Sequence, residues 1–251
     1  MRGNQHFLFT FFTLGALLFP LSFFTFDFSY LWLLFWACIG SLLPDVDVGK
    51  GHEARSKIGG TAFFVGIKGA QAINLIFGKI LSITGIITHW LVFKPYSLIL
   101  WLLGFRVSFK HRGIFHSLPA AIFTSIFLTV LVYFVANYIG FSSPQFQFYT
   151  FLGILFGFLF HLFHDSLTIS GVQWLAPFLS FEIYGNHKTG GEGQLLPTLF
   201  IFYLMLVAIV PTLEHFIYAR FSLQEIMQIV SIAIAIGWII FAILKGIRIR
   251  K

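Results

Sequence analysis

Charged residues are scarce in this sequence, and their scarcity excludes an ordinary soluble domain. Asp, Glu, Lys and Arg make up 10% of the 251 residues, whereas 58% are apolar and 35 residues are phenylalanine. Soluble domains carry about 25% charged residues. The composition therefore predicts a polytopic membrane protein, in which lipid covers the apolar surface and helices satisfy the backbone polar groups.

Cysteine is nearly absent as well. The single cysteine, Cys38, lies between apolar neighbours and can form no internal disulfide, so we interpret it as a packing residue. A cleavable signal peptide is not expected, because the apolar run over residues 7–26 is longer than a signal h-region and lacks a small-residue cleavage site. This run is predicted to remain as the first crossing.

Long apolar runs are what the sequence does contain. A crossing needs about 20 residues in a helix. Six runs approach this length, at residues 7–26, 30–43, 118–139, 146–164, 195–217 and 226–244. The middles of these runs contain no Asp, Glu, Lys or Arg. The sequence predicts an all-α transmembrane bundle of about six crossings, forming one integral-membrane domain over residues 1–251.

The region between residues 55 and 105 fits this pattern less simply. Its apolar residues are interrupted by Lys68, Lys79 and Lys94 and by several glycines. Interfacial or re-entrant helices would explain the interruptions, and so would one further hairpin of two crossings. Both alternatives leave the orientation of the following helices unchanged.

Basic residues are distributed unevenly between the predicted loops. Nine Lys and Arg lie between residues 50 and 112 and four more close the chain, whereas the turns near Asp27 and over residues 141–147 contain none. The positive-inside rule then predicts that both termini are cytoplasmic in a multi-pass protein of the inner membrane. It also explains the net charge of +7 without direct nucleic-acid binding, because the basic residues form no single stripe.

Metal-type ligands fall at the predicted cytoplasmic ends of four crossings. Ionisable groups near membrane depth are rare and by default mark a functional site. The candidates are His6, Asp45, Asp47, His111, His116, His161 and Asp165. Their delivery to one depth by separate segments indicates a shared site.

Two of these segments pair carboxylates with each other or with histidine. Asp45 and Asp47 follow Pro44, and we expect a non-helical turn that aims both at one point, although a solvated loop is the simpler alternative. His161 and Asp165 are four residues apart and share a helical face, so they can bind one ion, or the carboxylate can orient the imidazole. His164, which could instead reach the lipid headgroups, stays open.

A basic turn leads into the crossing that begins near residue 118. Ser117 is expected to cap this helix, with Pro119 in its first turn. His116 and His111 could ligate a metal or act as general acid or base, and Arg112 could clamp a phosphate. The simpler alternative is an interfacial anchor. For the glycine-rich loop around His187 we prefer a linker over a mobile lid.

Taken together, these blocks resemble the YdjM-like family of inner-membrane proteins, which are described as metal-dependent hydrolases and also labelled LexA-binding. The resemblance rests on the early His6, on Leu42-Leu43-Pro44-Asp45-Val46-Asp47, on His111-Arg112-Gly113 with His116-Ser117, and on His161 with Asp165 and the residues up to Pro177. It implies a divalent-metal hydrolytic site on those His and Asp positions and supplies no substrate. Phe109-Lys110 stands where a glycine often precedes the His111 block.

The resemblance divides the chain into a metal-site part, residues 1–177, and a remainder, residues 178–251, in which a loop and two crossings are inferred from hydropathy alone. The leading hypothesis is a membrane-bound hydrolase. One or two divalent ions, with zinc, manganese or iron preferred for mixed His and carboxylate ligands, would act on a phosphoester or lipid-linked substrate at the cytoplasmic membrane surface.

Two other functions stay open. The protein could be a regulatory or scaffold protein with a structural metal, and a LexA-type partner follows from the family label alone. A divalent-cation transporter is less favoured, because transporters place coupling residues near the bilayer midplane and the middles of these crossings carry no acids. In every case membrane lipid is the expected surrounding partner.

Overall fold

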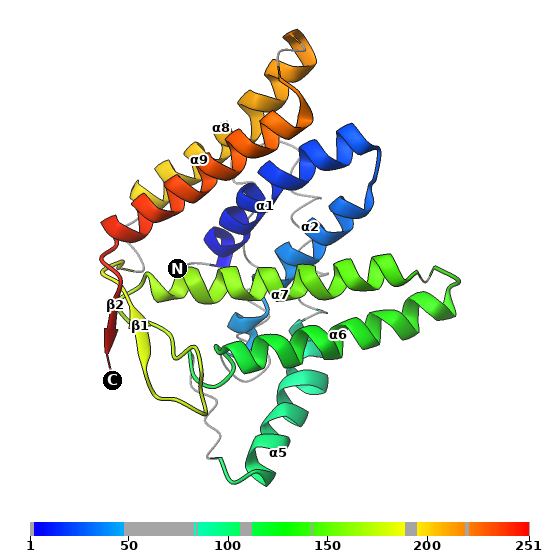
Figure 1. Ribbon diagram of the computed structural model, residues 1–251. Coiled ribbons are helices and arrows are strands. Elements are labelled where there is room, and N and C mark those ends of the chain that lie inside the picture. The colour runs from blue at the N-terminus through cyan, green and yellow to red at the C-terminus, as the bar shows by residue number, and fades with distance from the viewer. Residues whose placement is uncertain are drawn as a thin grey trace.

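The computed structural model shows a bundle of helices with a small antiparallel ribbon at one end (Figure 1). It describes residues 3–47, 83, 85–105, 112–141, 143–188, 195–218 and 221–250. The helices are α1 (Gly3–Thr25), α2 (Ser29–Gly40), α5 (Lys94–Leu102), α6 (Leu118–Tyr138), α7 (Pro144–Ser166), α8 (Leu195–Tyr218) and α9 (Leu223–Leu244). A 3-10 turn η1 (Pro44–Asp47), a π-helical segment η2 (Thr88–Phe93), and strands β1 (Glu182–Tyr184) and β2 (Arg248–Arg250) complete the described elements.

The predicted all-α membrane architecture is confirmed. Each of the six apolar runs becomes a helix, and six helices among the described residues are long and apolar enough to cross a membrane. The six long helices differ from the six predicted runs at one position. Residues 85–102 form such a helix, whereas α2 has only 12 residues and would span about 18 Å of a core roughly 30 Å thick. Residues 55–82, where further helices were expected, lie outside the described part.

The end of α2 differs from the expected non-helical turn. The helix ends at Gly40, and the chain then re-enters a short 3-10 turn that begins at Pro44. Proline disfavours the α conformation in the residue before it but is tolerated at the start of a helical turn, where its missing N–H is not needed. The expectation of a non-helical turn was therefore wrong, and Asp45 lies on a regular turn.

Serine caps begin both α6 and α7. Ser117 accepts a hydrogen bond from the backbone N–H of Ala120, with proline in the first turn of α6, as predicted. Ser143 does the same for Phe146 ahead of Pro144 at the start of α7. Each cap satisfies one of the donors that a helix start leaves unpaired. These caps fix where the two helices begin.

Helices α2 and α7 pack closely through three glycines. A Cβ at Gly153 would lie 2.6 Å from the Leu33 carbonyl oxygen, one at Gly40 would lie 2.5 Å from the Ile154 oxygen, and one at Gly157 would overlap the Ala37 carbonyl. Gly153 and Gly157 are four residues apart, the small-xxx-small spacing that lets membrane helices approach. The close packing brings the end of α2 against the last turns of α7.

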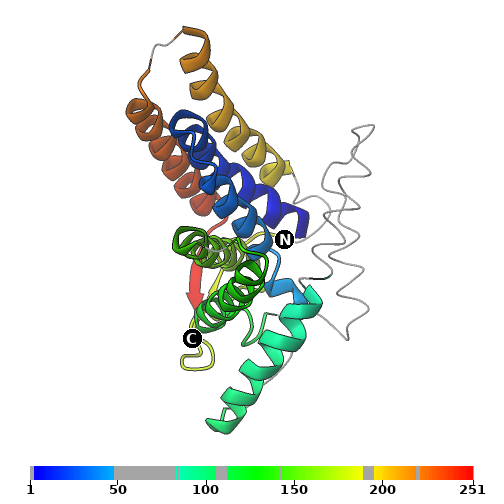
Figure 2. The ribbon, with the colours of Figure 1, turned by 90° about the vertical axis from the view of Figure 1, so that its right-hand side faces the viewer.

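The ends of several helices gather at one end of the bundle. Figure 1 shows the C-terminal end of α7, the start of α6, the C-terminal end of α9 and the β1–β2 ribbon together, far from the α6–α7 and α8–α9 connections. Figure 2 shows the α8–α9 hairpin on one side of α6 and α7, with α5 extending away on the other. We call the gathered end the polar end. Its assignment to the cytoplasm stays a prediction.

Candidate metal centre

Three histidines and two aspartates from four segments meet at the polar end. His6 comes from α1, Asp45 from η1, His116 from the turn before α6, and His161 and Asp165 from the last turns of α7. The three histidines and Asp165 are at most 1% exposed, whereas Asp45 is 23% exposed. The structure thus brings together five of the residues that the sequence singled out, and we call them the five-residue cluster.

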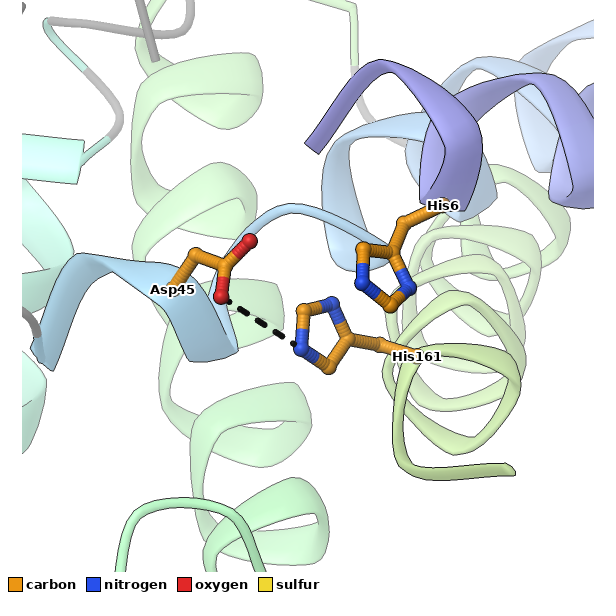
Figure 3. A group of neighbouring side chains, drawn as sticks. All are labelled: His6, Asp45 and His161. Atoms are coloured by element: carbon orange, nitrogen blue, oxygen red, sulfur yellow. Dashed lines mark ion pairs between the residues drawn. The ribbon is translucent and has the colours of Figure 1, made fainter. Parts of the chain in front are cut away.

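The five-residue cluster forms two overlapping groups of ligand atoms. One contains His6, Asp45 and His161 (Figure 3), and the other contains His116, His161 and Asp165. Within each group the ligand atoms lie within 4.8 Å of one another. Because His161 belongs to both groups, it lies at the middle of the cluster.

The hydrogen bonding of His161 determines which of its nitrogens faces the cluster. Its Nδ1 lies 2.7 Å from the carbonyl oxygen of Ser41, just past the end of α2. A carbonyl can only accept, so Nδ1 carries the proton and donates it. In the neutral ring the lone pair is therefore on Nε2, which is buried and makes no hydrogen bond to the described residues.

Two carboxylates face that lone pair. His161 Nε2 lies 3.6 Å from Asp45 Oδ1, the contact drawn in Figure 3, and 3.4 Å from Asp165 Oδ2. His116 Nε2 lies 3.9 Å from both Asp45 Oδ1 and Asp165 Oδ2. Electron-rich atoms from three segments therefore converge on one small volume.

Asp165 divides its two oxygens between different partners. Oδ1 accepts a hydrogen bond of 2.7 Å from Arg112 Nη2 and lies 3.4 Å from His6 Nε2, while Oδ2 faces His161 and His116. Arg112 also donates to the Thr168 hydroxyl at 2.6 Å, and Thr168 in turn donates to the Asp165 backbone oxygen at 2.6 Å. The guanidinium therefore lies against Asp165, at the edge of the cluster.

Opposing influences act on the pKa of Asp45. Burial raises the pKa of this carboxyl, but a positive charge on His161 and a hydrogen bond with His116 lower it, so the pKa lies well below the ordinary aspartate value when positive charge faces it. Asp45 is also the most exposed member of the cluster, so it forms the accessible side of the site.

The other sequence-predicted residues divide into two kinds. His111 lies outside the described residues, and so does the side chain of Asp47. His187 belongs to neither group of ligand atoms, although its backbone pairs with residues 167–169, next to Asp165. Its ring is 1% exposed and its Nδ1 lies 3.0 Å from Lys245 Nζ. The interpretation of the surrounding loop as a linker stays a prediction.

Sequence reasoning missed two contributors to the site. The Ser41 carbonyl orients His161, and no sequence signal identifies a backbone oxygen for this role. His164 was left open, although it lies three residues from His161 on a nearby face. In the structure it is fully buried and contacts His6 at 3.4 Å.

The donor set fits a transition-metal ion. Imidazole nitrogens with carboxylate oxygens are typical ligands of zinc, manganese and iron, whereas calcium prefers oxygen ligands alone. The five-residue cluster offers three nitrogens and two carboxylates. His161 offers one lone pair and would bind one ion, so a second, neighbouring ion would have to share the carboxylates.

Comparisons with known proteins give one match. A family described as YdjM inner membrane protein matches residues 1–246. No curated protein and no solved structure matches the chain significantly. The family match extends through α8 and α9, well beyond the motifs that end near Pro177.

Proposed function

The chain belongs to the YdjM inner membrane protein family, and from this premise we propose that it is a membrane-bound, metal-dependent hydrolase. Its site opens at the cytoplasmic surface, which requires both termini to be cytoplasmic. Its substrate is a phosphoester in a lipid or lipid-linked molecule. Membership of an inner-membrane family and six long apolar helices support the location.

One observation supports the metal above all others. The Nε2 lone pair of His161 is buried and faces carboxylate oxygens at 3.4 and 3.6 Å. Electron-rich atoms held this close repel one another strongly where water is largely excluded. A cation at the point of convergence turns the repulsion into coordination. Protonation of His161 is the competing explanation, and a metal measurement distinguishes the two.

The residues of the chain would share the work of hydrolysis. A bound divalent ion supplies Lewis acidity and a water of lowered pKa. His6, His116, His161 and the two aspartates would hold it, and Arg112 keeps Asp165 turned toward the cluster through its 2.7 Å hydrogen bond. His116 can alternatively carry a proton to the leaving group. Asp45 lies on the side from which substrate arrives.

The substrate class follows from where the cluster lies. His6 is in the first turn of α1 and Asp165 in the last turn of α7, so the site is at the end of spanning helices, at headgroup depth. The Arg112 guanidinium beside it can bind a phosphate oxygen in addition to Asp165, because its planar fork carries five donors. A phosphoester in a lipid headgroup would lie at this depth and would offer a phosphate oxygen to Arg112.

Metal analysis and an activity screen test the proposal. Purified protein in detergent should contain about one or two equivalents of zinc, manganese or iron. The metal-loaded protein should hydrolyse at least one of a panel of phospholipids, polyprenyl phosphates and soluble aryl phosphates, and chelation should stop the reaction. Protein that binds none of these ions with measurable affinity would contradict the proposal. So would full occupancy without turnover of any phosphoester.

A structural metal in a regulatory protein is the second candidate, and burial favours it. Four of the five cluster residues are at most 1% exposed, and structural sites are closed and fully ligated by protein. A LexA-type partner would then be tested by co-purification. This candidate would be favoured if the protein retains its metal and is stabilised by it but hydrolyses nothing in the screen. No described contact favours a transporter.

A further inference from the structure

His164 lies between the five-residue cluster and the C-terminal hairpin. It is fully buried, and its Nδ1 lies 3.4 Å from Nδ1 of His6. On its other side its ring stacks on Trp238 of α9, with centroids 5.2 Å apart and an interplanar angle of 20°. His164 is thus in contact with the cluster without belonging to either group of ligand atoms.

The contact between His164 and His6 requires one donor and one acceptor. If His164 donates, His6 carries its proton on Nε2 and has no lone pair there for a metal. If His6 donates from Nδ1, its Nε2 lone pair is free, 3.4 Å from Asp165 Oδ1, and His164 carries its own proton on Nε2. The two arrangements predict opposite roles for His6.

A metal-binding role for His6 selects the second arrangement. Only there does His6 offer an Nε2 lone pair to an ion beside Asp165. The surroundings of His164 accommodate this arrangement, because its ring is buried among Phe9, Phe160, Phe163 and Trp238 at centroid distances of 4.9, 6.0, 6.3 and 5.2 Å and its Nε2 makes no hydrogen bond to the described residues. With an ion on His6, the proton of His164 is therefore on Nε2.

We propose that His164 is a positioning residue that accepts a hydrogen bond from His6 Nδ1 and thereby presents the Nε2 lone pair of His6 to the metal. The proposal rests on the metal centre proposed above. Ligating histidines generally donate their second N–H to a partner that fixes the ring. His161 uses the Ser41 carbonyl in this way, and His164 does the same for His6.

This role connects the C-terminal hairpin to the site. The Trp238 indole that stacks on His164 donates to Thr13 of α1 at 3.2 Å, which holds α9 against the helix that carries His6. His6, His164 and Trp238 thus form a continuous chain of contacts from the cluster to α9. Residues beyond the motifs therefore contribute to the geometry of the site.

The proposal is tested by comparing the metal affinity of two variants of His164. His164→Leu fills the aromatic surroundings but accepts no hydrogen bond, whereas His164→Asn places an amide oxygen at the position of Nδ1. We expect zinc affinity, measured by chelator competition, to fall about 10- to 100-fold in His164→Leu, as for the loss of other outer partners, and to recover in His164→Asn. The absorption of bound cobalt should change in His164→Leu and return in His164→Asn. Phe156→Leu, on the exposed side of α7, is the control and should leave zinc affinity unchanged.

The outcomes separate this proposal from the one on which it rests. Wild-type affinity in His164→Leu would overturn the positioning role while leaving the metal centre intact. Equal losses in His164→Leu and His164→Asn would also overturn it, because packing alone would then explain the effect. Absence of metal binding in the wild-type protein would overturn both. Elution as a single species for every variant excludes misfolding.

Discussion

Two buried histidine sites lie at the polar end of this protein, and they differ in the charge that faces them. In the five-residue cluster, His161 faces two carboxylates at 3.4 and 3.6 Å. In the second site, His187 faces the ammonium of Lys245 at 3.0 Å. Both rings are at most 1% exposed. Burial alone is therefore not what distinguishes the candidate metal site; the convergence of buried imidazoles with carboxylates is.

The difference also separates two kinds of stabilisation. At His187 the ammonium donates to Nδ1 and satisfies that nitrogen, whereas Nε2 makes no hydrogen bond to the described residues. In the five-residue cluster the hydrogen bonds hold the residues from outside, through Ser41 and Arg112. The inward-facing nitrogens and carboxylate oxygens lie 3.4–3.9 Å from one another. An added cation is expected to stabilise the cluster and to leave the His187 site unchanged.

The largest effect should come from Asp165→Asn, which removes a carboxylate from the cluster. Loss of a residue that only supports a ligand lowers metal affinity by up to about 100-fold. Asp165 is itself a proposed ligand, so zinc affinity should fall by more than this, and hydrolysis should be lost. Metal content and chelator competition measure this. Asp27→Asn, at the α1–α2 turn, is the control and should change neither quantity. An Asp165→Asn protein that still holds a full equivalent of metal would show that the cluster is not the binding site.

Gly157→Ala should weaken the cluster indirectly. A Cβ at this position would overlap the Ala37 carbonyl, so α2 must move away from α7 and carry the Ser41 carbonyl from His161. Overpacking of this kind costs about 1–3 kcal/mol. We expect a lower thermal midpoint in detergent together with weaker zinc binding. Phe156→Leu, on the exposed side of the same helix, should change neither; an unchanged Gly157→Ala protein would argue against close α2–α7 packing.

Lys245→Met tests the second site and should leave the first intact. It removes the donor to His187 Nδ1 and leaves a buried acceptor unpaired, which costs about 1 kcal/mol. The thermal midpoint should fall slightly, and metal content and affinity should equal those of the wild type. A loss of metal in Lys245→Met would mean that the two sites are coupled, and it would contradict this prediction.

The smallest effect is a pH dependence at His187. Burial and the neighbouring Lys245 lower the pKa of His187 to about 4 from its ordinary value of 6.5. Between these values the unfolded chain binds a proton that the folded chain does not, so this contribution to stability decreases as pH falls through the window. His187→Asn does not titrate. The midpoint difference, wild type minus His187→Asn, should therefore decrease from pH 7 to pH 4.5, and a constant difference would exclude the shift.

Much of the fold and part of the site could be predicted from the sequence. Runs of apolar residues without charges predict spanning helices because lipid accepts no unpaired backbone group, and Ser117 with Pro119 located the start of α6. Ligand types at the ends of the runs selected His6, Asp45, His116, His161 and Asp165, which the structure brings together. The 3-10 turn at Pro44 was not foreseen, since hydropathy does not report the local backbone conformation after a helix ends.

The sequence alone determined the membrane class, the family resemblance and the residue types available for a metal, because composition and local spacing are properties of the chain. Only the tertiary structure decided which atoms face one another. The α2–α7 packing brings the Ser41 carbonyl to His161, and α9 brings Trp238 to His164. These pairs are 120 and 74 residues apart in sequence. Histidine chemistry depends on which nitrogen holds the proton, and at His161 a partner distant in sequence sets that choice.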